Sequence, residues 1–121
     1  MTYKNHNTVL SRPLSALTRE HFEAMRDAGI YGVEVSPRAN EYDEADLTAI
    51  KMLADEYGIV LWSFHLRFHD FEGYDISNLN ASGRRHAIDY AKKFIEKSGA
   101  VGIRYVIIHA SGGPIEECDI S

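Results

Sequence analysis

An unbroken run of β-branched residues late in the chain, Val106-Ile107-Ile108, limits the folds that this sequence can adopt. A strand with one face in water alternates apolar and polar side chains, whereas a run without alternation is typical of a strand buried on both faces. Such strands belong to parallel sheets that helices cover. Residues 59–64 form a second apolar run. The two runs therefore predict an α/β fold built on a parallel sheet.

Three expected helices separate four expected strands, in the order β-α-β-α-β-α-β. The strands are predicted at residues 8–10, 31–36, 59–65 and 106–108. The first two helices are predicted between a capping residue and a terminating glycine, Thr18 to Gly29 and Asp43 to Gly58. The third is predicted from about Ser82 to Lys97, closed by Gly99. Strands that recur roughly every 25 to 45 residues are typical of right-handed parallel crossover units. We expect one domain over residues 1–121, with no linker and no second domain.

Each expected helix has an apolar face that would pack on the sheet. The residues of these faces are Phe22, Met25 and Ala28 in the first helix, Leu47, Ile50, Ala54 and Tyr57 in the second, and Ile88, Ala91 and Ile95 in the third.

Composition excludes several classes of partner and location. The net charge of −5 does not favour a phosphate-rich partner such as DNA. No apolar run approaches the length of a membrane span, and the N-terminus does not resemble a secretory signal. Cys118 is the single cysteine, so no intrachain disulfide can form. We therefore expect a cytoplasmic protein with no nucleic-acid or membrane partner.

Two histidines close neighbouring strands of the predicted sheet. His65 ends the third strand and His109 follows the fourth. Adjacent parallel strands lie about 4.8 Å apart, so two such residues can line one pocket or share one metal ion. The alternative is a pair of structural histidines at the rim of the sheet. We favour the functional interpretation, because chemistry in parallel α/β folds occurs at the carboxyl ends of the strands.

Glu34 lies within an apolar strand, near its carboxyl end. A carboxylate in that position is costly unless it is paired or hydrogen-bonded. It would either face the pocket and hold a substrate hydroxyl, or form a structural ion pair with Arg12 or Arg67.

Two further residues are candidates for lining the pocket. Trp62 offers an aromatic face to a sugar, although we favour packing in the core for a residue in the middle of a strand. Ser111 and the two glycines after it could present backbone N–H groups to a phosphate, but a plain turn ended by Pro114 is an equal alternative. His69 and Asp70, in the loop after the third strand, would fold over a substrate or remain solvated.

Four segments of the chain resemble the N-terminal half of a xylose isomerase-like barrel. They are Gly32-Val33-Glu34-Val35, Trp62-Ser63-Phe64-His65, the loop at residues 75–80, and Val106-Ile107-Ile108-His109. That superfamily includes sugar-phosphate isomerases and epimerases, inosose-handling enzymes and the apurinic-site endonucleases. The resemblance implies that residues 1–121 form four strands and three helices, about half of an eight-stranded TIM barrel.

The resemblance also implies a function that uses a divalent metal, Mn²⁺, Mg²⁺, Co²⁺ or Zn²⁺, and a sugar or sugar phosphate as substrate. In the endonuclease branch, histidines at the positions of His65 and His109 bind metal, and in the sugar branch they more often contact substrate. The family's main metal ligands lie on strands five to eight, which this chain does not supply. We therefore expect the 121-residue chain to be inactive by itself.

Two alternatives to the isomerase or epimerase half remain. One is a non-catalytic half-barrel that self-associates through the open edges of its sheet to form a homodimer. The other is a hydrolase similar to the apurinic-site endonucleases. The net charge and the acidic loop residues disfavour the DNA-binding rim that this last function needs; these residues are Glu41, Asp43, Asp70, Glu72 and Asp75.

Overall fold

Four parallel strands form one sheet in the computed structural model, which describes residues 5–68 and 71–110. The strands are β1 (Asn5–Arg12), β2 (Ile30–Val35), β3 (Val60–His65) and β4 (Tyr105–Ile107). They lie side by side in the order β1-β2-β3-β4, and each neighbouring pair is parallel. The predicted α/β architecture, about half of a TIM barrel with four strands and three main helices, is confirmed.

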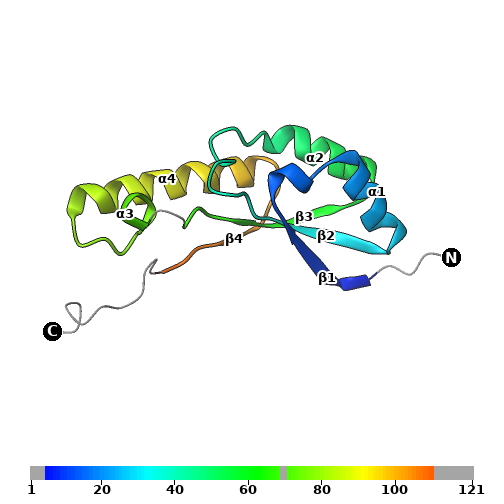
Figure 1. Cartoon of the computed structure of the whole chain (residues 1–121), viewed down its shortest axis with the longest axis horizontal. Helices are drawn as coiled ribbons and strands as arrows, with labels where there is room; N and C mark the ends of the chain where they lie inside the picture. Colours follow the sequence, from blue (N-terminus) through cyan, green and yellow to red (C-terminus); the bar gives the residue numbers. More distant parts are fainter. Residues whose placement is uncertain (1–4, 69–70, 111–121) are drawn as a thin grey trace.

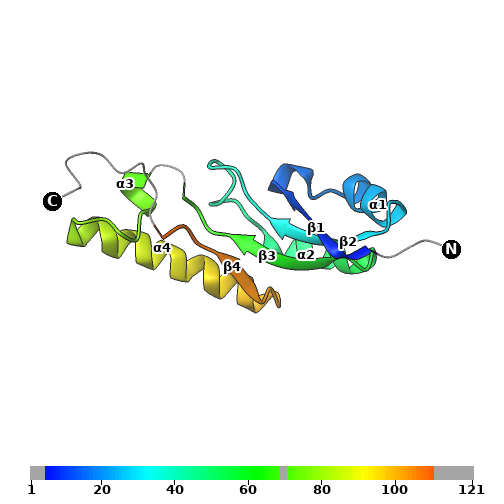
Figure 2. The same ribbon diagram turned by 90° about the horizontal axis from the view of Figure 1, so that it is seen from below.

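The three main helices all lie on one face of this sheet. They are α1 (Arg19–Asp27), α2 (Leu47–Glu56) and α4 (Ala81–Ala100), and Figure 1 shows them on the same side of the strands. Figure 2 views the other side, where the strands lie in front of α2. Two short elements complete the described chain, the 3-10 turn η1 (Leu14–Ala16) and the helix α3 (Phe71–Tyr74). The helix α3 lies in the segment after β3 that was predicted to be a loop. None of the described helices is both long and apolar enough to cross a membrane.

The helix starts follow capping chemistry, with one difference from the prediction. Thr18 caps α1 as predicted, because its side chain accepts a hydrogen bond from the backbone N–H of His21. The N-cap of α2 is Asp46, whereas the prediction of Asp43 is wrong. Asp43 instead accepts a hydrogen bond from the hydroxyl of Tyr90, at 3.0 Å, so a contact distant in sequence occupies its carboxylate.

Glycines in the left-handed region follow the main helices. Gly29 has a φ of 74° and Gly58 a φ of 65°, which agrees with their predicted roles. The third expected stop, Gly99, is wrong because α4 continues to Ala100. Gly102, with a φ of 85°, takes the left-handed conformation there.

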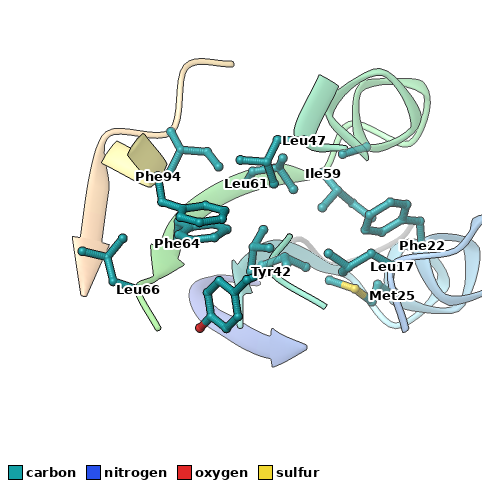
Figure 3. Close-up of a cluster of buried hydrophobic side chains, with 14 residues drawn as sticks. Leu17, Phe22, Met25, Tyr42, Leu47, Ile59, Leu61, Phe64, Leu66 and Phe94 are labelled. Atoms are coloured by element: carbon teal, nitrogen blue, oxygen red, sulfur yellow. The ribbon is translucent and has the colours of Figure 1, made fainter. Parts of the chain in front are cut away.

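An aromatic cluster connects α4 to the sheet (Figure 3). The rings of Phe64 on β3 and Phe94 on α4 stack with their centroids 5.6 Å apart, and Tyr42 meets both rings edge-on. Farther along the sheet, Phe22 and Met25 of α1 are buried as predicted. The core is therefore a single layer between the helices and one face of the sheet.

The buried face of α4 differs from the predicted one. Ala87, Phe94 and Ser98 are buried, whereas Ile95 is 44% exposed. Of the predicted positions, Ala91 does pack against the core. Docking of Phe94 on Phe64 sets the rotation of the helix, so Ile95 turns toward solvent.

The opposite face of the sheet is apolar and uncovered in the described part of the chain. The prediction that residues 106–108 are buried on both faces is therefore wrong for this structure. Exposed apolar side chains along β3 and β4 include Val60 (54%), Trp62 (50%), Tyr105 (53%) and Ile107 (40%). In a closed (β/α) barrel the equivalent face points into the packed interior, which accounts for its composition.

A carboxylate joins the loops that follow β1 and β2. Glu41 accepts hydrogen bonds from the backbone N–H of Ser15, at 2.8 Å, and from that of Arg38, at 2.6 Å. Partial burial disfavours the charged carboxylate, but the backbone donors outweigh that effect and lower the pKa of Glu41. The carboxylate therefore fixes two loops at the carboxyl end of the sheet.

Truncation of Phe94 should destabilise the fold strongly. We expect Phe94→Ala to lower the free energy of unfolding by about 3–5 kcal/mol, because it leaves a cavity between α4 and β3. Chemical denaturation followed by circular dichroism measures this. Ile95→Ala is the matched control on the same helix, and an equal loss in both variants would contradict the position of the core.

Replacement of Glu41 should have an effect that depends on pH. A pKa that is lower in the folded state stabilises the fold at neutral pH, and this stabilisation is lost as the pH falls through the folded-state pKa. We expect Glu41→Gln to cost about 1 kcal/mol at pH 7 and progressively less below about pH 4. Denaturation at several pH values tests this, with Glu44→Gln as control. A cost that is independent of pH would contradict the role of the charge.

Candidate functional site

A bulge in β3 turns two consecutive side chains toward the uncovered face. Val33 pairs with Leu61, but the next residue of β2, Glu34, pairs with Ser63, so β3 contains one additional residue, Trp62. Leu61 and Phe64, on either side, are buried against the helices. Trp62 and Ser63 consequently face the same side of the sheet as Glu34.

Two hydroxyl groups hold the carboxylate of Glu34. Ser63 donates to Oε2 at 3.0 Å, and Ser11, from the strand on the other side, lies 3.4 Å from Oε1. These hydroxyls, rather than the expected Arg12 or Arg67, are the partners that the structure shows for Glu34. Neutral donors stabilise the charge without cancelling it, so the carboxylate remains able to accept a further hydrogen bond.

Glu34 lines an open hollow in the uncovered face of the sheet. Trp62 and Tyr105 form one wall, with ring centroids 5.4 Å apart and an angle of 31° between the rings. The interpretation of Trp62 as a core residue is wrong for the described chain, because its side chain is half exposed. The complete lining is Val9, Ser11, Glu34, Trp62, Ser63, Tyr105 and Ile107. Sequence reasoning missed Ser11, Ser63 and Tyr105, although the spacing of Tyr105 and Ile107 by two residues places these two on one face of the strand.

The side chains of His65 and His109 meet at the carboxyl end of the same face. Their Nε2 atoms are 3.2 Å apart. The Nδ1 atom of His65 lies 2.8 Å from the carbonyl oxygen of Leu66. Because a carbonyl only accepts, Nδ1 of His65 carries a proton, and in the neutral ring its Nε2 presents a lone pair. That lone pair can accept from His109 or bind a metal ion.

Neighbouring groups fix the position of this histidine pair. The ring of Phe68 stacks on His109 with a centroid distance of 4.2 Å and an angle of 7°, and it lies 5.1 Å from the His65 ring. The hydroxyl of Tyr42 donates to the backbone carbonyl of His65 at 2.8 Å. Burial raises the pKa of Tyr42, so its hydroxyl keeps its proton at neutral pH and remains a donor.

The donor atoms of the pair fit a shared metal ion. Two imidazoles on one tetrahedral zinc, with Zn–N distances near 2.05 Å, have nitrogens about 3.3 Å apart. The observed 3.2 Å between the Nε2 atoms is close to this separation. Within residues 5–68 and 71–110, no third histidine, cysteine or carboxylate joins them in a cluster. The described part of the chain thus offers two nitrogen donors at this point.

The histidine pair and the hollow are continuous along the sheet. Ile107 lines the hollow, and its backbone pairs with His65 in the register of β3 and β4. His109 follows Ile107 by two residues, just beyond the end of β4. One surface therefore carries Glu34 among apolar and aromatic side chains, with the two imidazoles at its carboxyl end.

Several predicted residues lie outside the described part of the chain. They are Ser111, for which a phosphate contact was one alternative, and His69, Asp70 and Cys118.

Comparison with known proteins gives one family. The family model described as xylose isomerase-like TIM barrel matches residues 22–119. A search of curated proteins found no match. The matched residues span most of the chain and include three of the four strands, both histidines and Glu34. The chain therefore belongs to the xylose isomerase-like TIM barrel family.

Proposed function

We propose that this chain forms the β1–β4 side of the active site of a metal-dependent sugar or sugar-phosphate isomerase or epimerase. The observation that supports the proposal is the convergence of the two Nε2 atoms, 3.2 Å apart, at the carboxyl end of a parallel sheet. That end is where (β/α) barrels place their chemistry. Membership of the family agrees with this location of the site.

In this proposal His65 and His109 hold the divalent metal. A metal-bound histidine usually donates its other ring N–H to a carbonyl or a carboxylate, as His65 does to Leu66. Imidazole suits zinc and related transition metals better than it suits Mg²⁺, so this half of the site favours Zn²⁺ or Co²⁺. When bound, the metal would polarise a carbonyl and hydroxyl pair on the substrate.

Glu34 and the hollow beside it would hold the remainder of the sugar. The carboxylate can accept a hydrogen bond from a substrate hydroxyl, and the exposed ring of Trp62 can pack against the C–H face of a sugar. A DNA substrate is a weaker alternative. The net charge of −5 and the carboxylates around the loops disfavour an anionic backbone.

Metal titration tests the first step of this proposal. We expect the protein to bind Co²⁺ or Zn²⁺ in calorimetry, and His65→Ala or His109→Ala to weaken binding by at least about ten-fold. His21→Ala, which removes an exposed histidine on α1, is the matched control. Equal affinity in all four proteins would overturn the assignment of the pair.

Sugar binding tests the second step in the same variants. Saturation-transfer NMR with a panel of aldoses, ketoses and their phosphates should detect weak binding in the metal-loaded protein. We expect Glu34→Gln to reduce this signal while leaving metal affinity unchanged, because Glu34 contacts substrate and not metal. Signals from double-stranded oligonucleotides but not from sugars would favour the endonuclease-like alternative.

The uncovered sheet face favours a second candidate function, in which two copies of the chain close one barrel. We propose this because β1 and β4 are the edges of the described sheet and are parallel to each other. Two copies would therefore pair β4 of one with β1 of the other and supply eight strands. The apolar residues Val60, Trp62, Tyr105 and Ile107 would then face the barrel interior.

Solution mass tests this second candidate. We expect light scattering after size exclusion to give twice the mass of the chain. Trp62→Arg should shift the protein to monomer, since a charge would lie in the closed interior. Ile95→Arg, at a similarly exposed apolar residue on the helix side, is the control and should remain dimeric. A monomeric wild-type protein would refute self-association.

A further inference from the structure

We propose that Arg67 is a positioning residue for His109, acting through the ring of its neighbour Phe68. The proposal rests on the proposed function, because it concerns how the histidine pair is held. The two residues follow β3 directly. Arg67 contacts aromatic rings from the helical side, whereas Phe68 contacts the imidazoles.

His109 needs support from side chains because it lies beyond the regular sheet. β4 ends at Ile107, and the carbonyl of Ile107 accepts the backbone hydrogen bond from Leu66 there. The side chain of His109 is exposed. The parallel stack of Phe68 on the imidazole, at 4.2 Å and 7°, and the contact with His65 therefore restrict the rotation of that ring.

The position of Phe68 depends in turn on a clamp of three tyrosines around Arg67. The guanidinium lies over the ring of Tyr74 at 4.1 Å, and 5.9 Å from the rings of Tyr42 and Tyr90. Nη1 of Arg67 also lies 3.5 Å from the hydroxyl of Tyr90. The rings come from three places: the loop before α2, α3 and α4. Arg67 thus ties the end of β3 to three separate elements.

The clamp is itself anchored to the core. The Tyr90 hydroxyl donates to Asp43 at 3.0 Å, and its ring lies 5.0 Å from that of Phe94 and 4.6 Å from that of Tyr74. Burial raises the pKa of Tyr90, so the phenol keeps its proton and its donor function at neutral pH. In this inference the clamp fixes the backbone at Arg67, and this in turn fixes the direction in which the side chain of Phe68 points.

Arginine suits this clamp in a way that lysine does not. The flat guanidinium stacks on one ring while its edge faces others, whereas an ammonium group is a compact point charge. Arg67→Lys keeps the charge but loses the flat contact. The expected consequence is a Phe68 ring that leaves the His109 face for part of the time.

Proton NMR of the histidine rings tests this inference without any metal. In the wild-type protein the ring current of Phe68 should change the chemical shifts of the His109 ring protons. Phe68→Leu gives the chemical shifts of these protons without the stack. Arg67→Lys and Tyr74→Leu both keep Phe68. We expect each to move the His109 resonances toward the Phe68→Leu position. Phe68→Tyr, which preserves the aromatic stack, should keep the His109 resonances at their wild-type chemical shifts.

Arg26→Lys is the matched control, because Arg26 lies over the ring of Tyr57 at 5.1 Å in a similar contact on α1. It should leave His109 unchanged, and His21 should not shift in any variant. The inference would be overturned if the His109 ring protons kept their wild-type chemical shifts in both Arg67→Lys and Tyr74→Leu.

Metal affinity separates this inference from the proposed function. If the wild-type protein binds Co²⁺, Arg67→Lys should weaken binding by about ten-fold, a typical effect of a residue that orients a ligand. If the wild-type protein binds no metal but the His109 resonances shift as expected, positioning by Arg67 is supported and the metal proposal fails.

Discussion

One-sided coverage of the sheet is the constraint on which the rest of the structure depends. All three main helices pack on the same face, where the Phe64–Phe94 stack and the buried residues of α1 form the core. Burying apolar surface there drives the fold, at about 25 cal/mol per Å² removed from water. In the described residues no helix covers the other face, so its side chains lie open to solvent or to a ligand.

The alternation of a strand then decides which residues form the site. Tyr105 and Ile107, two residues apart on β4, both line the hollow in the uncovered face, and His109, just beyond the end of the strand, meets His65. On β3 the bulge at Trp62 interrupts this period, and the interruption is what brings Ser63 to Glu34 and still leaves Phe64 in the core. A regular strand would have sent either Ser63 or Trp62 to the helical side. The hydrogen bond from Ser63 to Glu34 therefore depends on the bulge in β3.

Local sequence determined the elements well, but contacts distant in sequence determined the details. The location of His65 and His109 at the carboxyl end of the sheet was predictable, because each histidine directly follows an apolar run in the local sequence. Asp43 and Asp46 are both plausible caps in sequence, and the Tyr90 hydroxyl decides between them. Periodicity similarly places Ile95 on the apolar face of α4, until Phe94 docks on Phe64 and rotates it outward. The tyrosines around Arg67 come from three elements, so no local pattern could indicate that clamp.

The polar groups of the uncovered face lie toward the carboxyl ends of the strands. Toward the amino ends it carries exposed apolar and aromatic side chains such as Val60 and Trp62. Toward the carboxyl ends it carries Glu34 and then the two imidazoles. Apolar groups gain from being enclosed, whereas a carboxylate and two imidazoles need water, a metal or a polar ligand. Enclosing the apolar side chains therefore leaves the carboxyl end of the face open, where Glu34 and the imidazoles can interact with water or a polar ligand.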